Sequence, residues 1–400
     1  MNAINKFFRF IFDRHVILSK IAFFINEEYM LDHYTAVIKN LDPKVVDIVL
    51  ADKFNDVKYD KLISDLVSES WNIVFLSQVF HIKKYKVLVT NQFFGGDTES
   101  SGTFTQRILN IVQMAFTSAG IKFSKKLPKQ YFQKSLGVYN IRFMYGADQS
   151  ASKFGRYNSL FDEFFCHGPR DSEIVQEEYD VPVFQMGYPR YDKYFDNLNN
   201  KKYKDSILNK YSCDHKKPTI LWIVTVSTHF STIETYEQYM KLLTVKYNVI
   251  LRPHPLEIDP QYDRYNQKVS DIVNSGDFFV SDDAHQNMSD LYLIADYVFC
   301  DYGGTIFSAL YLDKKILLLN HENASKDPEI YESTSMEIRN YLPAISIDNA
   351  DPFDDSFAEE LRLDKREASR KEVGQRFFGN SRENSALKVA NRMMEILENI

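Results

Sequence analysis

The sequence of 400 residues contains only three cysteines, and none of them is part of a CxxC pair. Cys166, Cys213 and Cys300 are too few and too widely spaced for a disulfide framework or a zinc knuckle, so we expect a reducing compartment. No apolar run approaches the roughly 18 residues that a membrane-spanning helix needs, and the N-terminus lacks the pattern of a cleavable signal. These absences predict a cytoplasmic protein.

An excess of basic residues is also absent. The chain has 48 lysines and arginines against 55 aspartates and glutamates, which gives a formal net charge of -7. A nucleic-acid binder normally shows a basic domain or stripe, so we expect no nucleic-acid partner. The 44% hydrophobic content is ample for packed interiors, and the length favours two domains.

The segment 5–25, NKFFRFIFDRHVILSKIAFFI, mixes bulky apolar residues with basic side chains. As a helix it could lie in a membrane interface. Alternatively it packs as a helix on the first domain, because its apolar residues are spread too widely to form one clean face. The sequence therefore predicts a protein that is cytoplasmic or peripheral on the inner face of the cell membrane.

Short β-rich runs alternate with helical stretches along most of the chain, which predicts α/β domains with doubly wound parallel sheets. We expect an N-terminal Rossmann-like domain over 1–195, a polar linker over 196–217, a second Rossmann-like domain over 218–378 and a C-terminal amphipathic helix over 379–400. Two such domains would face each other across a cleft. Ligands of open α/β sheets bind at the carboxyl ends of the strands, so the loops after the strands are the places to search for chemistry.

One such loop is STHFST, which follows the apolar run ILWIVTV. Ser227, Thr228 and His229 offer hydroxyl, imidazole and amide donors suited to phosphate oxygens. Ordinary turn and helix-capping chemistry is the alternative interpretation.

A second loop, LRPHPLE, places Arg252 and His254 after another apolar run. A proline on each side of His254 narrows the directions in which its side chain can point. A guanidinium matches phosphate geometry, and a histidine can donate a hydrogen bond or a proton near neutral pH. The alternative is that His254 caps a turn and that Arg252 pairs with Glu257.

A third loop, DYGGT, lies between the short run YVFC and an expected helix. Gly303 and Gly304 permit close approach of a ligand to the backbone, and the helix that follows directs free N–H groups toward it. Asp301 and Thr305 flank the glycines. The spacing matches neither a Walker loop nor a dinucleotide fingerprint.

LRPHP followed by DLYLIADYVFCDYGG resembles the CDP-glycerol glycerophosphotransferase family of teichoic-acid-type polymerases, and GYPRYD (187–192) matches a further family motif. Arg190 and Asp192 of this motif are expected to pair. The resemblance implies a glycosyltransferase B-type (GT-B) fold, a reaction without metal or cofactor, and a nucleotide-diphosphate donor held mainly by the second domain. It also implies that His254 contacts the donor phosphates and that the segment 301–305 receives the pyrophosphate.

The sequence departs from the family pattern at four positions, one of which is Ser308, where the helix after the DYGG segment usually has an aspartate. Gly303 and Gly304 replace two serines. Tyr145 stands where the family has a histidine that is proposed as the base toward the acceptor hydroxyl, and a tyrosine with a pKa near 10 is a poor base at neutral pH. Asp148 and His167 are the alternative bases, while Tyr145 remains a candidate for substrate binding.

The leading interpretation is a transferase of bacterial cell-surface polymer synthesis, such as a teichoic-acid-like polymer or a capsule. It would move a polyol phosphate from a CDP-polyol donor to a hydroxyl of a glycan or polyol-phosphate acceptor. A GT-B glycosyltransferase that uses a UDP- or CMP-sugar is an alternative, as is a UDP-sugar epimerase. An alternative of another class is a noncatalytic scaffold that binds a nucleotide or a glycan.

Overall fold

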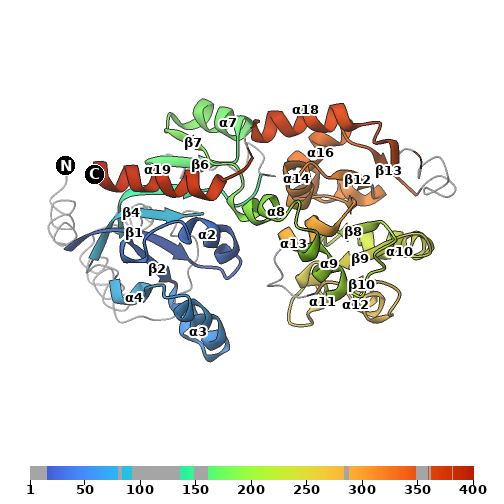
Figure 1. Ribbon diagram of the computed structural model, residues 1–400, viewed down its shortest axis with the longest axis horizontal. Helices are drawn as coiled ribbons and strands as arrows, with labels where there is room; N and C mark the ends of the chain where they lie inside the picture. The colour runs from blue at the N-terminus through green and yellow to red at the C-terminus, as the bar shows by residue number, and fades with distance from the viewer. Residues whose placement is uncertain are drawn as a thin grey trace, which may run out of the picture.

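The computed structural model describes residues 16–79, 83–91, 136–147, 161–282, 288–347, 359, 362–380 and 382–400. Two parallel sheets, each flanked by helices, form two lobes that are joined by the chain around α8 and by the segment between α18 and α19 (Figure 1). The arrangement confirms the predicted class of two doubly wound α/β domains. No helix of the described part is long and apolar enough to cross a membrane.

The first sheet has the strand order β3-β2-β1-β4-β5-β6-β7, and every pair of neighbours is parallel. Its strands are β1 (Val16–Ile25), β2 (Val46–Leu50), β3 (Ile73–Phe75), β4 (Lys83–Thr90), β5 (Gly137–Phe143), β6 (Glu163–Cys166) and β7 (Val183–Gln185). The helices of this lobe are α2 (Met30–Ile38), α3 (Asp60–Ser68), α4 (Leu76–Val79) and α7 (Pro169–Tyr179), and α8 (Asp192–Asp196) leads from it to the second lobe, where it contacts α13 (Met288–Ile294).

Strand β1 shows that the N-terminal helix expected over residues 5–25 is wrong for residues 16–25. These residues form a strand in the sheet, and its second half, from Ile21 to Ile25, is buried. A parallel strand that is buried on both faces has a continuous run of apolar residues, which explains why residues 16–25 showed no single apolar face. Residues 5–15 lie outside the described part of the chain.

The second sheet has the strand order β10-β9-β8-β11-β12-β13 and is also entirely parallel. Its strands are β8 (Thr219–Ile223), β9 (Asn248–Arg252), β10 (Phe279–Val280), β11 (Tyr297–Cys300), β12 (Lys315–Leu319) and β13 (Ala344–Ile345). The helices of this lobe are α9 (Lys201–Lys210), α10 (Thr232–Leu243), α11 (Pro255–Ile258), α12 (Gln267–Asn274), α13 (Met288–Ile294), α14 (Gly304–Tyr311), α15 (Pro328–Tyr331), α16 (Thr334–Glu337) and α18 (Glu367–Phe378). The last helix, α19 (Ser385–Asn399), packs on the first lobe.

The segment 196–217, which was expected to be a linker, includes helix α9. This helix packs on α13 of the second domain, where the Tyr203 hydroxyl donates to Asp290 Oδ1 over 2.8 Å. The polar stretch is therefore part of the second lobe rather than a free connection.

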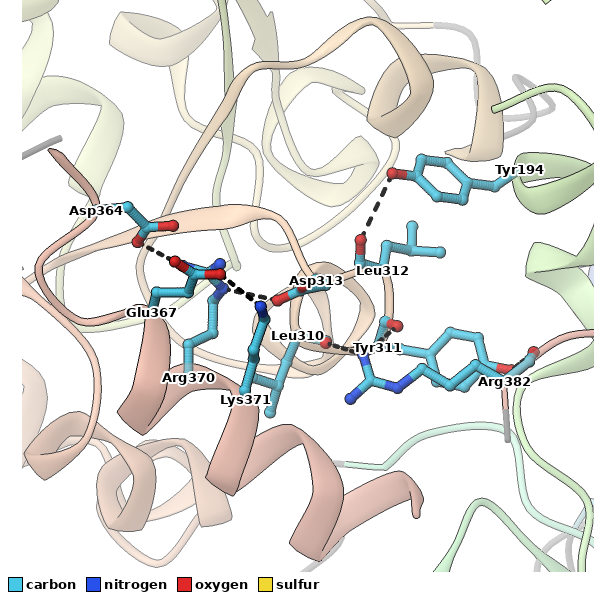
Figure 2. Close-up of polar contacts among 10 residues, drawn as sticks. All are labelled: Tyr194, Leu310, Tyr311, Leu312, Asp313, Asp364, Glu367, Arg370, Lys371 and Arg382. Carbon is cyan, nitrogen blue, oxygen red and sulfur yellow. Dashed lines mark hydrogen bonds and ion pairs between the residues drawn. The ribbon is translucent and has the colours of Figure 1, made fainter. Parts of the chain in front are cut away.

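The chain returns to the first domain through α18 and α19. Phe377 and Phe378 at the end of α18 belong to a core cluster of the second domain, whereas Val389 and Met393 of α19 pack in the core of the first. Between the two helices, the Arg382 guanidinium donates to the last carbonyls of α14, those of residues 310 and 311 (Figure 2). The crossing is therefore fixed to the helix that follows the DYGG loop.

Arg190 and Asp192 do not pair with each other, so that expectation is wrong. Arg190 forms an ion pair with Asp32 of α2. Asp192 instead accepts hydrogen bonds from the backbone N–H groups of Ser385 (3.1 Å) and Ala386 (2.7 Å), the first residues of α19. Asp192 thus caps a helix that is nearly 200 residues away in the sequence, which no local pattern could indicate.

We expect Asp192→Ala to lower the free energy of unfolding by about 1–2 kcal/mol, because two amides at the start of α19 lose their acceptor. Urea denaturation followed by circular dichroism measures the change. Asp196→Ala is the matched control, because Asp196 is exposed and its loss should change little. An equal loss in both variants would contradict the capping role.

Candidate functional site

The predicted donor residues gather at the carboxyl edge of the second sheet. The order of this sheet reverses between β8 and β11, and the loops that leave these two strands hold residues 225–231 and 301–303. The segment that contains His254 leaves the neighbouring strand β9. Crevices beside such a reversal are the usual ligand sites of open α/β sheets.

Asp301 joins the loops after β8 and β11. Its carboxylate is fully buried, and Oδ1 accepts hydrogen bonds from the backbone N–H groups of Thr225 (2.8 Å) and Tyr302 (2.6 Å). Oδ2 accepts a bond of 2.7 Å from the Thr232 hydroxyl. Burial raises the pKa of Asp301 to about 6, while these hydrogen bonds favour the ionised form. Asp301 therefore links the loops after β8 and β11 by buried hydrogen bonds, and its carboxylate is not accessible to a ligand.

The glycine pair allows the two loops to approach closely. Gly303 has a φ of +87°, which L side chains rarely adopt, and a Cβ added there would lie 3.2 Å from Thr225 Oγ1. Helix α14 begins at Gly304, so its first N–H groups lack partners within the helix. The Thr305 hydroxyl is buried and has no hydrogen-bond partner among the described residues. This combination supplies amide and hydroxyl donors for an anion.

The three residues predicted in the loop after β8 differ in accessibility. Ser227 Oγ donates to Asp327 Oδ2 over 2.7 Å and accepts from the backbone N–H of His229 over 3.0 Å. Its hydroxyl therefore shapes the loop. Thr228 and the side chain of His229 are exposed, so these two residues are open to a ligand.

The hydrogen bond made by the His254 ring indicates that this histidine is neutral and can act as a donor. Its Nδ1 accepts a hydrogen bond of 3.2 Å from the backbone N–H of Leu256, so the ring proton is on Nε2. Burial, together with the positive charges of Arg264 and Arg252, lowers the pKa of His254 to about 4. Arg252 itself is largely buried and donates from Nη1 to the carbonyl oxygen of Ser281 over 2.7 Å. The expected turn cap is present, and it leaves Nε2–H available to a ligand.

Glu257 is a residue of this region to which the sequence assigned no role in the site. It lies one turn after His254 and is 2% exposed, and its Oε2 has no hydrogen-bond partner among the described residues. Burial, followed by the charges of Asp301 and Glu234, raises the pKa of Glu257 to about 8. The carboxyl group is therefore uncharged at neutral pH. The sequence marked Glu257 through its place within LRPHPLE, but its protonation depends first on burial in the folded protein and then on the charges of Asp301 and Glu234.

Arg339 is the second residue that the sequence did not indicate. Its guanidinium lies 4.0 Å from the centre of the Tyr302 ring and donates to the carbonyl oxygen of Asp301. Nη1 donates to Asn320 Oδ1 over 2.6 Å. Arg339 thus holds the backbone of the DYGG loop and places a positive charge behind it.

We expect Arg339→Lys to weaken about tenfold the binding of the nucleotide-diphosphate donor that the motifs predict, because one ammonium cannot reproduce the forked contacts to Asp301 and Asn320. Isothermal titration with CDP-glycerol measures the affinity. Arg366→Lys, at an exposed position, is the control and should bind as the wild type does. Unchanged affinity in Arg339→Lys would show that the loop does not depend on this guanidinium.

Two candidate residues of the first domain, Tyr145 and His167, follow strands β5 and β6. Tyr145 follows β5, is 36% exposed, and its carbonyl oxygen accepts from the Tyr188 hydroxyl over 3.0 Å. His167 follows β6 and has no exposed surface; its Nδ1 is 3.4 Å from Asp171 Oδ2. Asp148 lies outside the described residues.

The surroundings of His167 belong to the junction between the domains. Arg170, in the first turn of α7, lies 3.6 Å from Asp171 Oδ1 and donates to the Thr334 hydroxyl of the second domain over 3.2 Å. A Cβ added to Gly168 would lie 2.3 Å from the carbonyl oxygen of Phe377. His167 is therefore enclosed where the two lobes meet.

Solved structures with the same fold include several of wall teichoic acid biosynthesis. The wall teichoic acid polymerase TagF matches with a TM-score of 0.60 at 15% identity and covers 96% of this chain and 90% of that one. A TagF variant soaked with CDPG matches equally well. The S. aureus MnaA–UDP co-structure has a TM-score of 0.54 at 16% identity, with coverage of 96% and 98%. These likenesses confirm the GT-B fold.

Sequence comparison gives the family. A curated teichoic acid glycerol-phosphate transferase of Staphylococcus aureus (strain NCTC 8325 / PS 47) is 24% identical over 166 residues, which are 38% of this chain and 40% of the relative. The chain thus spans well under half the length of that relative. The model of the CDP-glycerol:poly(glycerophosphate) glycerophosphotransferase family matches residues 131–395, about two thirds of the chain. The chain therefore belongs to this family of transferases, as its LRPHP and DYGG motifs predicted.

Proposed function

We propose that this protein transfers glycerol phosphate from CDP-glycerol to a hydroxyl of an acceptor during the synthesis of a bacterial cell-surface polymer. The observation that carries the proposal is that two kinds of neutral donor, the Nε2–H of His254 and the free backbone amides of residues 303–305, lie at the same edge of the second sheet. Family membership and the TagF variant soaked with CDPG support the choice of donor.

In this reaction the acceptor oxygen attacks the phosphorus that carries glycerol. A new P–O bond forms, the bond from this phosphorus to the oxygen shared with CMP breaks, and CMP leaves with the bonding electrons. Negative charge builds up on the pyrophosphate oxygens, and enzymes of phosphoryl transfer act mainly by positioning the groups and stabilising this charge. His254, the amides of 303–305 and the Thr305 hydroxyl would donate to these oxygens, with Thr228 and His229 at the rim.

The proton of the acceptor hydroxyl passes to a base of the first domain. His167 is fully enclosed and already faces Asp171, so it suits the domain junction better than an acceptor site. Asp148 remains the hypothesis for the base from the sequence. We also propose that the reaction needs no metal ion, and transfer should then persist in EDTA.

Product analysis tests the proposed reaction. The purified protein is incubated with CDP-glycerol, CDP-ribitol, a UDP-sugar or a CMP-sugar, together with oligo(glycerol phosphate) and disaccharide acceptors. We expect CMP to appear with CDP-glycerol in an acceptor-dependent manner. Release of UDP from a UDP-sugar would replace the proposal with glycosyl transfer. Binding of CDP-glycerol without product would favour the noncatalytic scaffold.

A further inference from the structure

Two tyrosines form an exposed aromatic pair on the first domain. Tyr29 is 49% exposed and Tyr145 is 36% exposed, and their ring centres are 5.9 Å apart with the planes inclined at 53°. Tyr29 lies between β1 and α2, and Tyr145 lies two residues after β5. Aromatic side chains normally bury most of their area, so a neighbouring pair of partly exposed rings is a candidate contact surface.

The pair lies where the first sheet is expected to bind ligands. Strands β1 and β4 are neighbours at the point where the strand order reverses, and β5 lies next to β4. Tyr29 and Tyr145 therefore both leave carboxyl ends of strands beside the reversal, the usual ligand position in an open α/β sheet. The DYGG loop has the equivalent position in the second sheet.

Side chains beneath the pair hold Tyr145 in place. The His33 ring meets the Tyr145 ring edge-on at 6.0 Å and stacks on Tyr188 at 6.4 Å. Nη1 of Arg190 lies 3.2 Å from Nε2 of His33, and since arginine only donates, His33 is held with the proton on Nδ1. The Tyr188 hydroxyl binds the Tyr145 backbone. The surface is therefore ordered before a ligand arrives, which lowers the entropic cost of binding.

Among the residues that the structure describes, two cations near this edge are already engaged and so do not favour a phosphate-rich ligand. Arg190 is paired with Asp32, and Lys53 is paired with Glu27 over 2.6 Å. Each of these cations thus already has a carboxylate partner, whereas phosphate binding relies on available arginine or lysine donors. Burial raises the pKa of Tyr29 to about 12, so its phenol stays neutral, and a hydrogen bond with the Asn91 side chain helps to hold it in place.

We propose that Tyr29 and Tyr145 bind a sugar ring of an uncharged saccharide, and that this saccharide carries the acceptor hydroxyl. The C–H face of a pyranose is apolar and stacks on aromatic rings, while its hydroxyls suit phenol and carboxylate partners. The role as acceptor rests on the proposed transferase function. The saccharide site itself stands on the tyrosine pair alone.

Saturation-transfer NMR tests the site with a panel of neutral disaccharides built from glucose, galactose and N-acetylglucosamine, with oligo(glycerol phosphate) as the competing ligand class. We expect saturation transfer to the C–H protons of at least one disaccharide, and at least a tenfold loss of affinity in Tyr29→Ala and in Tyr145→Ala. Tyr29→Phe and Tyr145→Phe keep the rings and should stay within threefold of the wild type. Tyr331→Ala, at another exposed tyrosine, should change nothing.

CDP-glycerol affinity, measured on the same samples by isothermal titration, separates this proposal from the proposed function. Disaccharide binding that depends on the two tyrosines, without CDP-glycerol binding, would overturn the function and keep the site. Normal CDP-glycerol binding without saturation transfer to any disaccharide would overturn the site. So would binding of oligo(glycerol phosphate) that is lost in the alanine variants. The melting temperature of each variant shows that it is folded.

Discussion

Replacing His254 by alanine is expected to lower the rate of CMP release from CDP-glycerol by about 10²–10³-fold, the usual cost of losing one donor to a developing negative charge. The structure supplies the reason. Leu256 N–H holds Nδ1, so Nε2–H points away from its own turn as a fixed, neutral donor. The rate is measured with saturating CDP-glycerol and acceptor, and CDP-glycerol affinity is measured separately.

His254→Gln distinguishes hydrogen bonding from proton transfer. Glutamine retains an N–H donor but cannot deliver a proton, so it should recover a substantial part of the lost rate if His254 acts as a donor. Because burial lowers the pKa of His254 to about 4, the wild-type rate should not change between pH 5.5 and 7.5 through this group. A rate that falls with rising pH in the wild type, together with an inactive glutamine variant, would show that His254 is a general acid.

The fold could be predicted because the apolar and polar residues of each strand or helix show how that element is buried. Strands such as β8 and β11 are short apolar runs between helical stretches, and this alternation has few solutions other than a doubly wound parallel sheet. Strand β1 was mistaken for a helix because burial on both faces removes the alternation of apolar and polar residues that identifies a strand. Its position inside the sheet, between β2 and β4, is set by tertiary structure and could not be predicted from its own sequence.

The candidate donor site could be predicted in part for a related reason. His254 and Asp301 both follow buried parallel strands, so their segments had to reach the same edge of one sheet. Arg339 could not be found, because it lies 38 residues after Asp301 in the sequence and meets it only in the folded protein. Asp192 likewise caps a helix near the C-terminus instead of pairing with Arg190. Partners of charged side chains are set by tertiary structure, whereas strand ends are set by local sequence.

Replacing Glu257 by glutamine is expected to remove a loss of donor affinity at high pH. In the wild type, burial and the nearby carboxylates of Asp301 and Glu234 raise the pKa of Glu257 to about 8. Above this pH the group becomes a carboxylate near the loops that we propose to bind the pyrophosphate, and like charges repel. If only the protonated form binds the donor, affinity falls about tenfold for each pH unit above the pKa. Titrations with CDP-glycerol between pH 6.5 and 9.5 measure this decline in affinity.

The glutamine variant should bind CDP-glycerol as the wild type does at pH 6.5 and should lack the decline above pH 8. Glu322→Gln is the matched control, because Glu322 is exposed and this variant should keep the wild-type profile. Parallel profiles in the wild type and in Glu257→Gln would show that the decline, if present, comes from another group.

The same carboxyl group should leave a signature in stability. In the unfolded chain Glu257 ionises near its ordinary pKa of 4.5, whereas in the folded protein it keeps its proton to about pH 8. Between these values the folded state binds more protons than the unfolded state, so this group lowers stability as pH rises through that window. Glu257→Gln removes the dependence, because an amide of the same shape does not ionise. We therefore expect the melting temperature of the variant to rise relative to the wild type from pH 5 to pH 8, and a constant difference would show that Glu257 is ionised in the folded protein.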